Sequence, residues 1–144
     1  MGRINFFGHI LSSKGVECNP QKTQAVLEAG RPQNVEEVRS FLGMVGFCSR
    51  FIPNYATINE PLRRLTKKKT KWNWGEQEEK AFNTLKQSLA SAKVMNYYDF
   101  NKYTEVIVDG SPVGLGAMLV QKQNTSDVGQ VVAYASRSLS GVEQ

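Results

Sequence analysis

The sequence has few residues of the kinds that bind metals or form disulfides. Its 144 residues include only two cysteines, Cys18 and Cys48, and a single histidine, His9. Neither cysteine belongs to a CxxC pair, and three scattered ligands make a poor zinc site, so no structural metal is predicted. Because thiols usually stay reduced in the cytosol, both cysteines are expected to be reduced, partly buried apolar residues.

Long apolar runs and targeting signals are also missing. No segment approaches the roughly 20 apolar residues of a membrane span. Residues 1–13 lack the apolar core and cleavage site of a signal peptide, and Phe6 stands where a myristoylation signal requires Ser or Thr. With 40% hydrophobic and 22% charged residues, the chain is expected to be a globular intracellular protein, cytoplasmic or nuclear, with no membrane partner.

Positive charge is concentrated in the first half of the chain. Residues 1–72 carry 12 lysines and arginines against 5 acidic residues, a balance of +7, whereas residues 73–144 carry 6 against 8, a balance of −2. Six of the cations fall within residues 63–71. A basic half of this kind suits a polyanion, while the other half offers carboxylates.

Capping residues predict the helices. Asn19 followed by Pro20 is typical of a helix start. Asn34 and Glu37 are spaced as a capping pair and predict a second, more apolar helix that Pro53 ends.

Two further helices are expected. Residues 55–65 form a third helical stretch, and Gly75 can cap a fourth helix with glutamates in its first turn. Gly43 and Gly46, inside the second helix, predict the close approach of another backbone.

After about residue 102 the hydrophobic period changes to that of strands. Residues 103–108, 116–121 and 131–135 are rich in β-forming side chains and are separated by short connections. They predict an antiparallel meander. The apolar run 4–12 is expected to form a strand or a turn-rich hairpin.

Four strings, in order along the chain, resemble the pol polyprotein of gypsy-type long-terminal-repeat retrotransposons. FFGHILSSKGVECNPQKTQAV resembles the segment after the palm of their reverse transcriptase. RPQNVEEVRSFLGMVGFCSRFIPNYATINEPLRRLTKK is similar to their thumb helices, and KWNWGEQEEKAFNTLKQSLASAKVMNYYDF to the tether that follows. TEVIVDGSPVGLGAMLVQ and VVAYASRSLS resemble the opening sheet of their ribonuclease H (RNase H) domain.

The resemblance implies an α+β fold with a helical thumb and tether lobe followed by an incomplete, RNase H-like antiparallel three-stranded sheet. Residues 1–72 would be the end of the palm and the thumb, residues 73–96 the tether helix, and residues 97–144 the truncated start of the RNase H-like domain. The sheet would lack its covering helices, so self-association through it is expected. The apolar side chains expected to lie open are Val106, Val108, Met118 and Val132.

The resemblance excludes polymerase chemistry for this chain alone, because the paired aspartates of the family's palm have no counterpart here. The Phe7-Gly8-His9 string resembles the part that supports the primer end, where a glycine lets the backbone approach nucleic acid closely. The alternative is that the phenylalanines are core residues and the glycine serves a turn.

Asp109 is the one candidate for metal binding and catalysis. The resemblance aligns it with an aspartate that binds two divalent cations in ribonucleases H, with Mg²⁺ as the cofactor of the complete enzyme. Two cations about 4 Å apart need several carboxylates, and the family's others lie beyond this chain, so no tightly bound metal is expected. The alternative is a strand-end aspartate in a local turn.

The basic segment also allows two interpretations. It is either a solvated loop or a site of salt-dependent, sequence-independent phosphate contact. The neighbouring tryptophans, Trp72 and Trp74, are expected to pack on the tether helix more than to stack on bases. The cations expected to contact nucleic acid are Arg63, Arg64, Lys67, Lys68 and Lys69.

Three functions remain open at this point. The first is a fragment that binds template–primer or RNA–DNA hybrid without a complete catalytic centre. The second is a hybrid ribonuclease completed by missing segments. The third is a co-opted or remnant interaction module without a nucleic-acid role.

Overall fold

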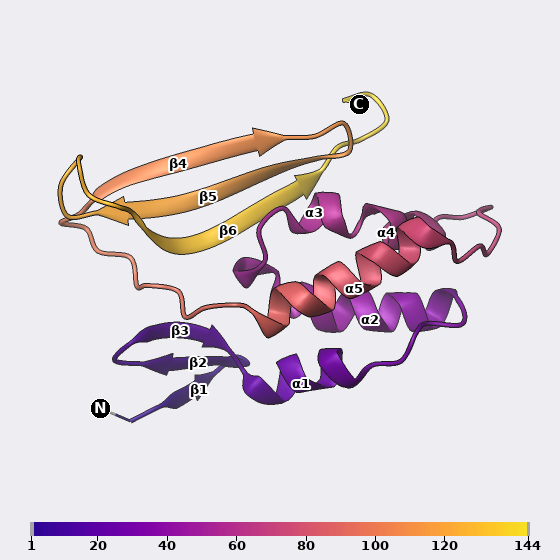
Figure 1. Ribbon diagram of the computed structural model, residues 1–144, viewed down its shortest axis with the longest axis horizontal. Coiled ribbons are helices and arrows are strands. Elements are labelled where there is room, and N and C mark those ends of the chain that lie inside the picture. Colours follow the sequence, from indigo (N-terminus) through magenta and orange to yellow (C-terminus); the bar gives the residue numbers. More distant parts are fainter. Residues whose placement is uncertain (1, 144) are drawn as a thin grey trace.

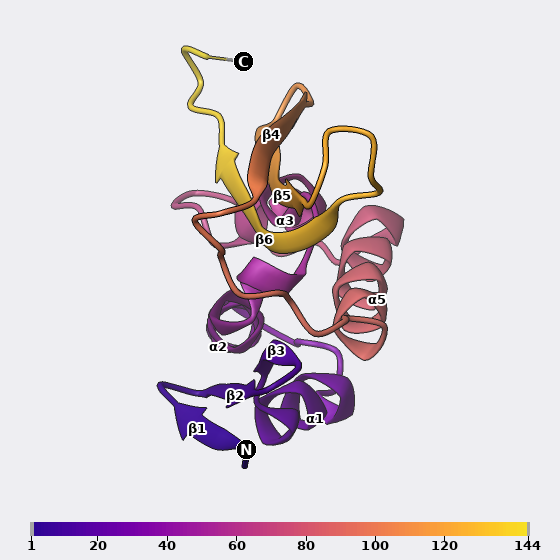
Figure 2. The same cartoon turned by 90° about the vertical axis from the view of Figure 1, so that its left-hand side faces the viewer.

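The structure, a computed structural model that describes residues 2–143, places helices between two small sheets (Figures 1 and 2). The first sheet contains β1 (Ile4–Phe6), β2 (His9–Ser12) and β3 (Gly15–Cys18). The helices are α1 (Pro20–Glu28), α2 (Val35–Phe47), the 3-10 helix η1 (Ser49–Phe51), α3 (Tyr55–Ile58), α4 (Glu60–Leu65) and α5 (Glu76–Ala90). The second sheet contains β4 (Tyr103–Gly110), β5 (Gly114–Lys122) and β6 (Gln130–Ser138). This confirms the α+β fold, and no helix in the described part is long and apolar enough to cross a membrane.

Local capping chemistry explains where the main helices begin. The Asn19 side chain accepts a hydrogen bond of 2.9 Å from the backbone N–H of Gln21 at the start of α1. The Asn34 side chain accepts one of 2.9 Å from the N–H of Glu37 at the start of α2. These side chains satisfy N–H groups that have no partner inside the helix, as the sequence predicts.

The chain between α2 and α5 is more broken than predicted. The second helix ends at Phe47 and not near Pro53, because the chain tightens into η1 at once. The third helical stretch divides into α3 and α4, with Asn59 buried between them. Pro61 explains the break, since it has no N–H to continue the hydrogen-bond ladder of α3.

The first sheet contains one strand more than expected. β2 pairs antiparallel with both β1 and β3, so residues 4–18 form a meander. Residues 13–14 form the turn, and Gly15, which the sequence placed in a break, begins β3. Val16 of β3 also exchanges two backbone hydrogen bonds with Met95, of 2.8 and 2.7 Å. The segment after α5 is therefore joined to the first sheet.

One hydrophobic core joins the first sheet, the helices and the segment that follows α5. Phe82, Leu85 and Leu89 of α5 are buried in this core, and the ring of Phe82 meets that of Phe41 in α2 with centroids 4.7 Å apart. The other buried members are Val16, Val26, Val38, Val45, Cys48, Phe51, Ile52, Leu62, Leu65, Ala81 and Met95.

The two cysteines are not separate thiols, contrary to the expectation from composition. Cys18, the last residue of β3, and Cys48, the first residue after α2, form a disulfide with their Cα atoms 5.8 Å apart. They are 30 residues apart in sequence, and only the packing of the first sheet on α2 brings them together.

The second sheet rests on the helical layer through its middle and last strands. β5 lies between β4 and β6, both pairings are antiparallel, and α3 packs against β5 and β6 (Figure 1). The hydroxyl of Ser136 accepts a hydrogen bond of 2.8 Å from the N–H of Ala56.

The far strand, β4, remains open. Val106 and Val108 are 62% and 65% exposed, as predicted, and Met118 is half-buried. The expectation for Val132 is wrong: it is only 4% exposed, because β6 lies directly against η1 and α3.

Candidate nucleic-acid interface

The turn between β1 and β2 projects a phenylalanine from the surface. Phe7 and Gly8 form a two-residue hairpin loop, and both have positive φ angles of 49° and 80°. Such loops match the twist of the flanking strands, but a bulky residue in this conformation is strained. The Phe7 side chain is 80% exposed, so this strain holds an aromatic ring in solvent.

Gly8 is required where the hairpin meets α2. A Cβ at this position would lie 2.3 Å from the Cε1 atom of Phe47, which no side chain tolerates without a shift. The glycine therefore serves the turn and also allows the hairpin to rest on the end of α2. The other part of the alternative interpretation is wrong, because Phe6 and Phe7 are 56% and 80% exposed and are not core residues.

His9 points inward. Its ring centroid lies 5.5 Å from that of Phe47 and 5.7 Å from that of Phe51, and its Nδ1 is buried without a hydrogen-bond partner among the described residues. Burial, and then the positive charge of Arg50, lower the pKa of the imidazole below its ordinary value. The side chain thus acts as a neutral packing residue behind the turn.

A groove between α1 and α2 continues from this hairpin. It has a volume of about 560 Å³. Phe47 and Met44, at one end, are 41% and 37% exposed, and the Lys22 ammonium lies 4.4 Å from the centre of the Phe47 ring. The residues that line the groove are Gln21, Lys22, Ala25, Arg39, Ser40, Gly43, Met44 and Phe47.

Gly43 opens the wall of this groove. The position is exposed, and a Cβ there would meet no atom within 4 Å. The prediction that Gly43 and Gly46 admit another backbone is therefore wrong, since Gly46 meets only the Tyr55 hydroxyl at 3.4 Å. What Gly43 provides is an uncovered stretch of helix backbone, which a ligand can approach closely.

The basic loop lies at the other end of α2. Arg39 in the groove donates a hydrogen bond of 3.3 Å to the carbonyl of Thr66, next to the loop. Lys67, Lys68 and Lys69 are exposed, and no salt bridge among residues 2–143 involves them. These lysines therefore keep their charge available to a partner.

The two arginines predicted with these lysines are less available. Arg64 donates 2.9 Å to the Gln77 side chain and lies 3.8 Å from a Glu60 carboxylate oxygen. Arg63 is half-buried, and its Nε has no hydrogen-bond partner in the described structure.

Trp74 packs on the tether helix, as expected. Its Nε1 donates a hydrogen bond of 2.6 Å to Glu79, and its ring meets the Phe82 ring with centroids 5.8 Å apart. This hydrogen bond, together with Arg31, lowers the pKa of the Glu79 carboxyl. Trp72 stacks on Trp74 but is 39% exposed.

Asp109 stands alone on the open strand. It is exposed near the end of β4, opposite Gly116 in the register. Within residues 2–143 there is no group of three or more histidine, cysteine or acidic residues that could hold a metal ion. The described residues therefore do not fit a centre of two divalent cations, which needs several converging carboxylates.

Sequence patterns did not identify the groove residues Lys22, Arg39 and Phe47 as functional. The one pattern in the sequence that pointed to them is the four-residue spacing of Arg39, Gly43 and Phe47. This spacing places an aromatic ring on the polar face of the helix. The groove itself depends on how α1 packs beside α2, which no local pattern encodes.

Comparisons with known proteins agree with this geometry. Residues 74–144 match the family described as the RNase H-like domain found in reverse transcriptase. The Tf2-3 and Tf2-4 transposon polyproteins of Schizosaccharomyces pombe are both 34% identical to this chain over 138 residues, which is 96% of the chain. The chain spans only 10% of the length of these relatives.

Solved structures show the same fold. One is the foamy viral protease-reverse transcriptase in complex with RNA/DNA hybrid, with a TM-score of 0.78 and 21% identity. The match covers 98% of the present chain and 19% of the viral chain. The same viral protein in complex with dsDNA matches 98% of this chain and 29% of its own, with a TM-score of 0.77 and 21% identity.

The lowered pKa of His9 predicts a loss of stability on mild acidification. Below its ordinary value of 6.5, the unfolded chain binds a proton that the folded chain resists, so the free energy of unfolding should fall as the pH drops through this range. His9→Gln should lose much of this dependence. Urea unfolding at pH 7.5 and 5.5 measures it, and an equal fall in both proteins would contradict the assignment, since His9 is the only histidine.

Proposed function

This chain belongs to the gypsy-type retrotransposon polyproteins, in their reverse transcriptase and RNase H-like region, and we propose that it forms part of the surface that holds template–primer or RNA–DNA hybrid. The observation that carries the proposal is the continuity of one surface along α2. The hairpin turn with Phe7 lies at one end, the groove with Gly43 in the middle, and the lysine loop at the other end.

The size of this surface suits a duplex. The 13 residues of α2 extend over roughly 20 Å at 1.5 Å per residue. Each strand of a duplex carries one phosphate per about 3.4 Å of the duplex axis, so a helix of this length that lies along the axis spans about six phosphates of one strand. Lys22 and the lysine loop supply cations over this length, whereas Arg39 is paired with the Glu36 carboxylate at 2.7 Å. Phe47 and Met44 offer apolar contact to sugars.

The similar structures support this partner. Both foamy viral structures hold nucleic acid, one RNA/DNA hybrid and the other dsDNA. The sequence identity to these structures is 21%, so they support the arrangement of the helices and strands. The proposed contacts of individual side chains are argued from the charge and exposure described above.

Removing two lysines from the loop should weaken binding in a salt-dependent manner. Lys67→Ala with Lys68→Ala should lower the slope of log affinity against log salt by about 2, because each lost phosphate contact releases about one fewer counterion. The control is Lys80→Ala with Lys93→Ala, which removes the same charge from exposed positions on and after α5. Fluorescence anisotropy with labelled hybrid gives both slopes, and equal slopes for the two variants would contradict a specific role for the loop.

Hybrid cleavage is a second function, which would require segments outside this chain. The observation in its favour is Asp109 near the end of β4, inside the matched RNase H-like region. This exposed carboxylate is one ligand at most, so the protein must obtain the remaining carboxylates from other segments of a longer polyprotein.

The chain alone should bind hybrid in Mg²⁺ without cutting it. A longer polypeptide that adds the downstream RNase H-like segment should cleave the RNA strand and lose cleavage with Asp109→Asn, while hybrid binding stays unchanged. A gel assay of labelled RNA measures both. Cleavage by the 144-residue chain, abolished by Asp109→Asn, would show that the carboxylate set is complete after all.

A further inference from the structure

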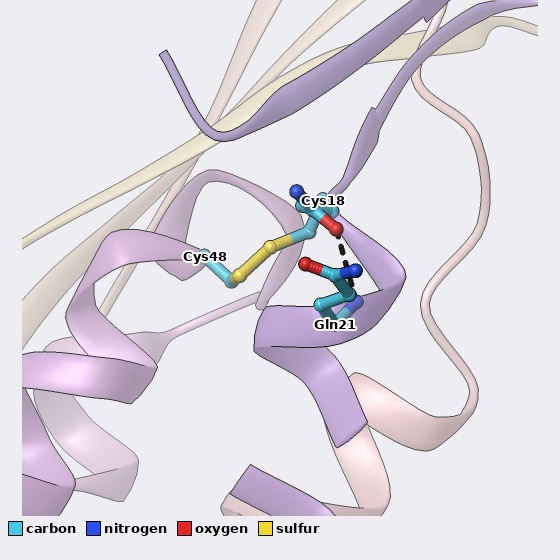
Figure 3. The surroundings of a disulfide bond; sticks show 4 residues. Cys18, Gln21 and Cys48 are labelled. Atoms are coloured by element: carbon cyan, nitrogen blue, oxygen red, sulfur yellow. Dashed lines mark hydrogen bonds between the residues drawn. A yellow bond between two sulfur atoms is a disulfide. The ribbon is translucent and has the colours of Figure 1, made fainter. Parts of the chain in front are cut away.

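The disulfide joins the two elements that form one end of the proposed interface. Figure 3 shows the bond between Cys18 and Cys48. Cys18 lies opposite His9 in the register of β2 and β3, and Cys48 directly follows Phe47 of α2. The backbone N–H of Asn19, next to Cys18, donates a hydrogen bond of 3.0 Å to the carbonyl of Gly8 in the turn. The bond therefore links the hairpin that carries Phe7 to the end of the helix that lines the groove.

We propose that Cys18 and Cys48 are a reversible thiol–disulfide pair whose oxidation strengthens the hold of this chain on nucleic acid. The inference rests on the proposed function, because the affected property is hybrid binding. The Cα separation of 5.8 Å lies within the range in which a disulfide forms without movement of the backbone.

Exchange takes place from the side of Cys18. Cys48 is fully buried, whereas Cys18 is only half-buried at the end of its strand. With glutathione disulfide as oxidant, the Cys18 thiolate attacks one sulfur and releases one glutathione thiolate. The Cys48 thiolate then attacks the Cys18 sulfur of the mixed disulfide and releases the second. Each cysteine thiol gives up its proton, and the two electrons reside in the reduced glutathione.

Oxidation has a direct structural consequence for the interface. It closes a loop between two positions 30 apart in sequence and so restricts the unfolded chain. It also fixes the hairpin turn over Phe47, where Gly8 already lies in close contact. In the reduced chain no covalent bond joins the hairpin to α2, and packing together with the hydrogen bond from Asn19 to Gly8 holds this end. Nucleic acid must then restrict its remaining motion on binding, which costs affinity.

The test uses the complete chain in glutathione buffers of varied reduced-to-oxidised ratio. Free thiols are counted by maleimide mass tagging after acid quenching, and affinity for labelled RNA–DNA hybrid is measured at fixed salt. The oxidised chain should bind about threefold to tenfold more tightly and melt on the order of 10 °C higher. The affinity change should follow the thiol count across the ratios.

Cys18→Ser provides the control, because the half-buried position tolerates a hydroxyl better than the fully buried Cys48 would. Its affinity and melting temperature should stay at the reduced wild-type values at every ratio. Thiols that remain free throughout, or that pair while affinity stays level or falls, would overturn this inference and leave the proposed function intact. Absence of hybrid binding in both states would overturn the proposed function and this inference with it.

Discussion

The burial of one face of α2 determines what its other face can do. Val38, Phe41 and Val45 are at most 2% exposed and fall on one side of the helix. The helix packs against α4, and its Phe41 ring meets the Phe82 ring of α5. At 3.6 residues per turn, this burial forces Arg39, Gly43 and Phe47 to the opposite side. The proposed interface is therefore a consequence of core packing, and any change that rotates α2 would remove the groove, the contact with the hairpin and the link to the lysine loop together.

The parts of the chain around α2 divide the physical tasks. The first sheet adds an aromatic ring at one end of the helix, and the lysine loop adds cations at the other end. The second sheet is attached to the helical layer through α3 and η1. Asp109 lies on that second sheet, on the strand farthest from the helices (Figure 1). The proposed binding surface and Asp109, the proposed metal ligand, therefore lie on separate parts of the chain, so the proposed binding does not depend on the metal chemistry.

Local chemistry made much of the fold predictable from the sequence. The starts of α1 and α2 follow from asparagine side chains that cap N–H groups a few residues away, and the three strands of the second sheet follow from their β-rich composition. The failures arise where distant segments meet. The Cys18–Cys48 bond spans 30 residues, and Val132 is buried because β6 rests on helices from the first half of the chain.

The candidate site shows the same division. Phe7, Gly8 and the lysines were recognisable because a hairpin turn and a run of cations are local patterns. The inward position of His9 and the groove residues Lys22 and Phe47 were not, since they depend on α1, α2 and the hairpin packing together. The resemblance to a family supplied the general function, but the surface that would perform it required the structure.

The most direct test of a binding surface along α2 is to place a negative charge in the groove without disturbing the core. Gly43→Glu suits this purpose, because the position is open, and Gly141→Glu is the matched control at another open glycine. Titration of both variants with RNA–DNA hybrid should show at least about a tenfold loss of affinity for Gly43→Glu, or about 1.4 kcal/mol, and little change for Gly141→Glu. Equal affinities in two folded variants would mean that nucleic acid does not bind along α2.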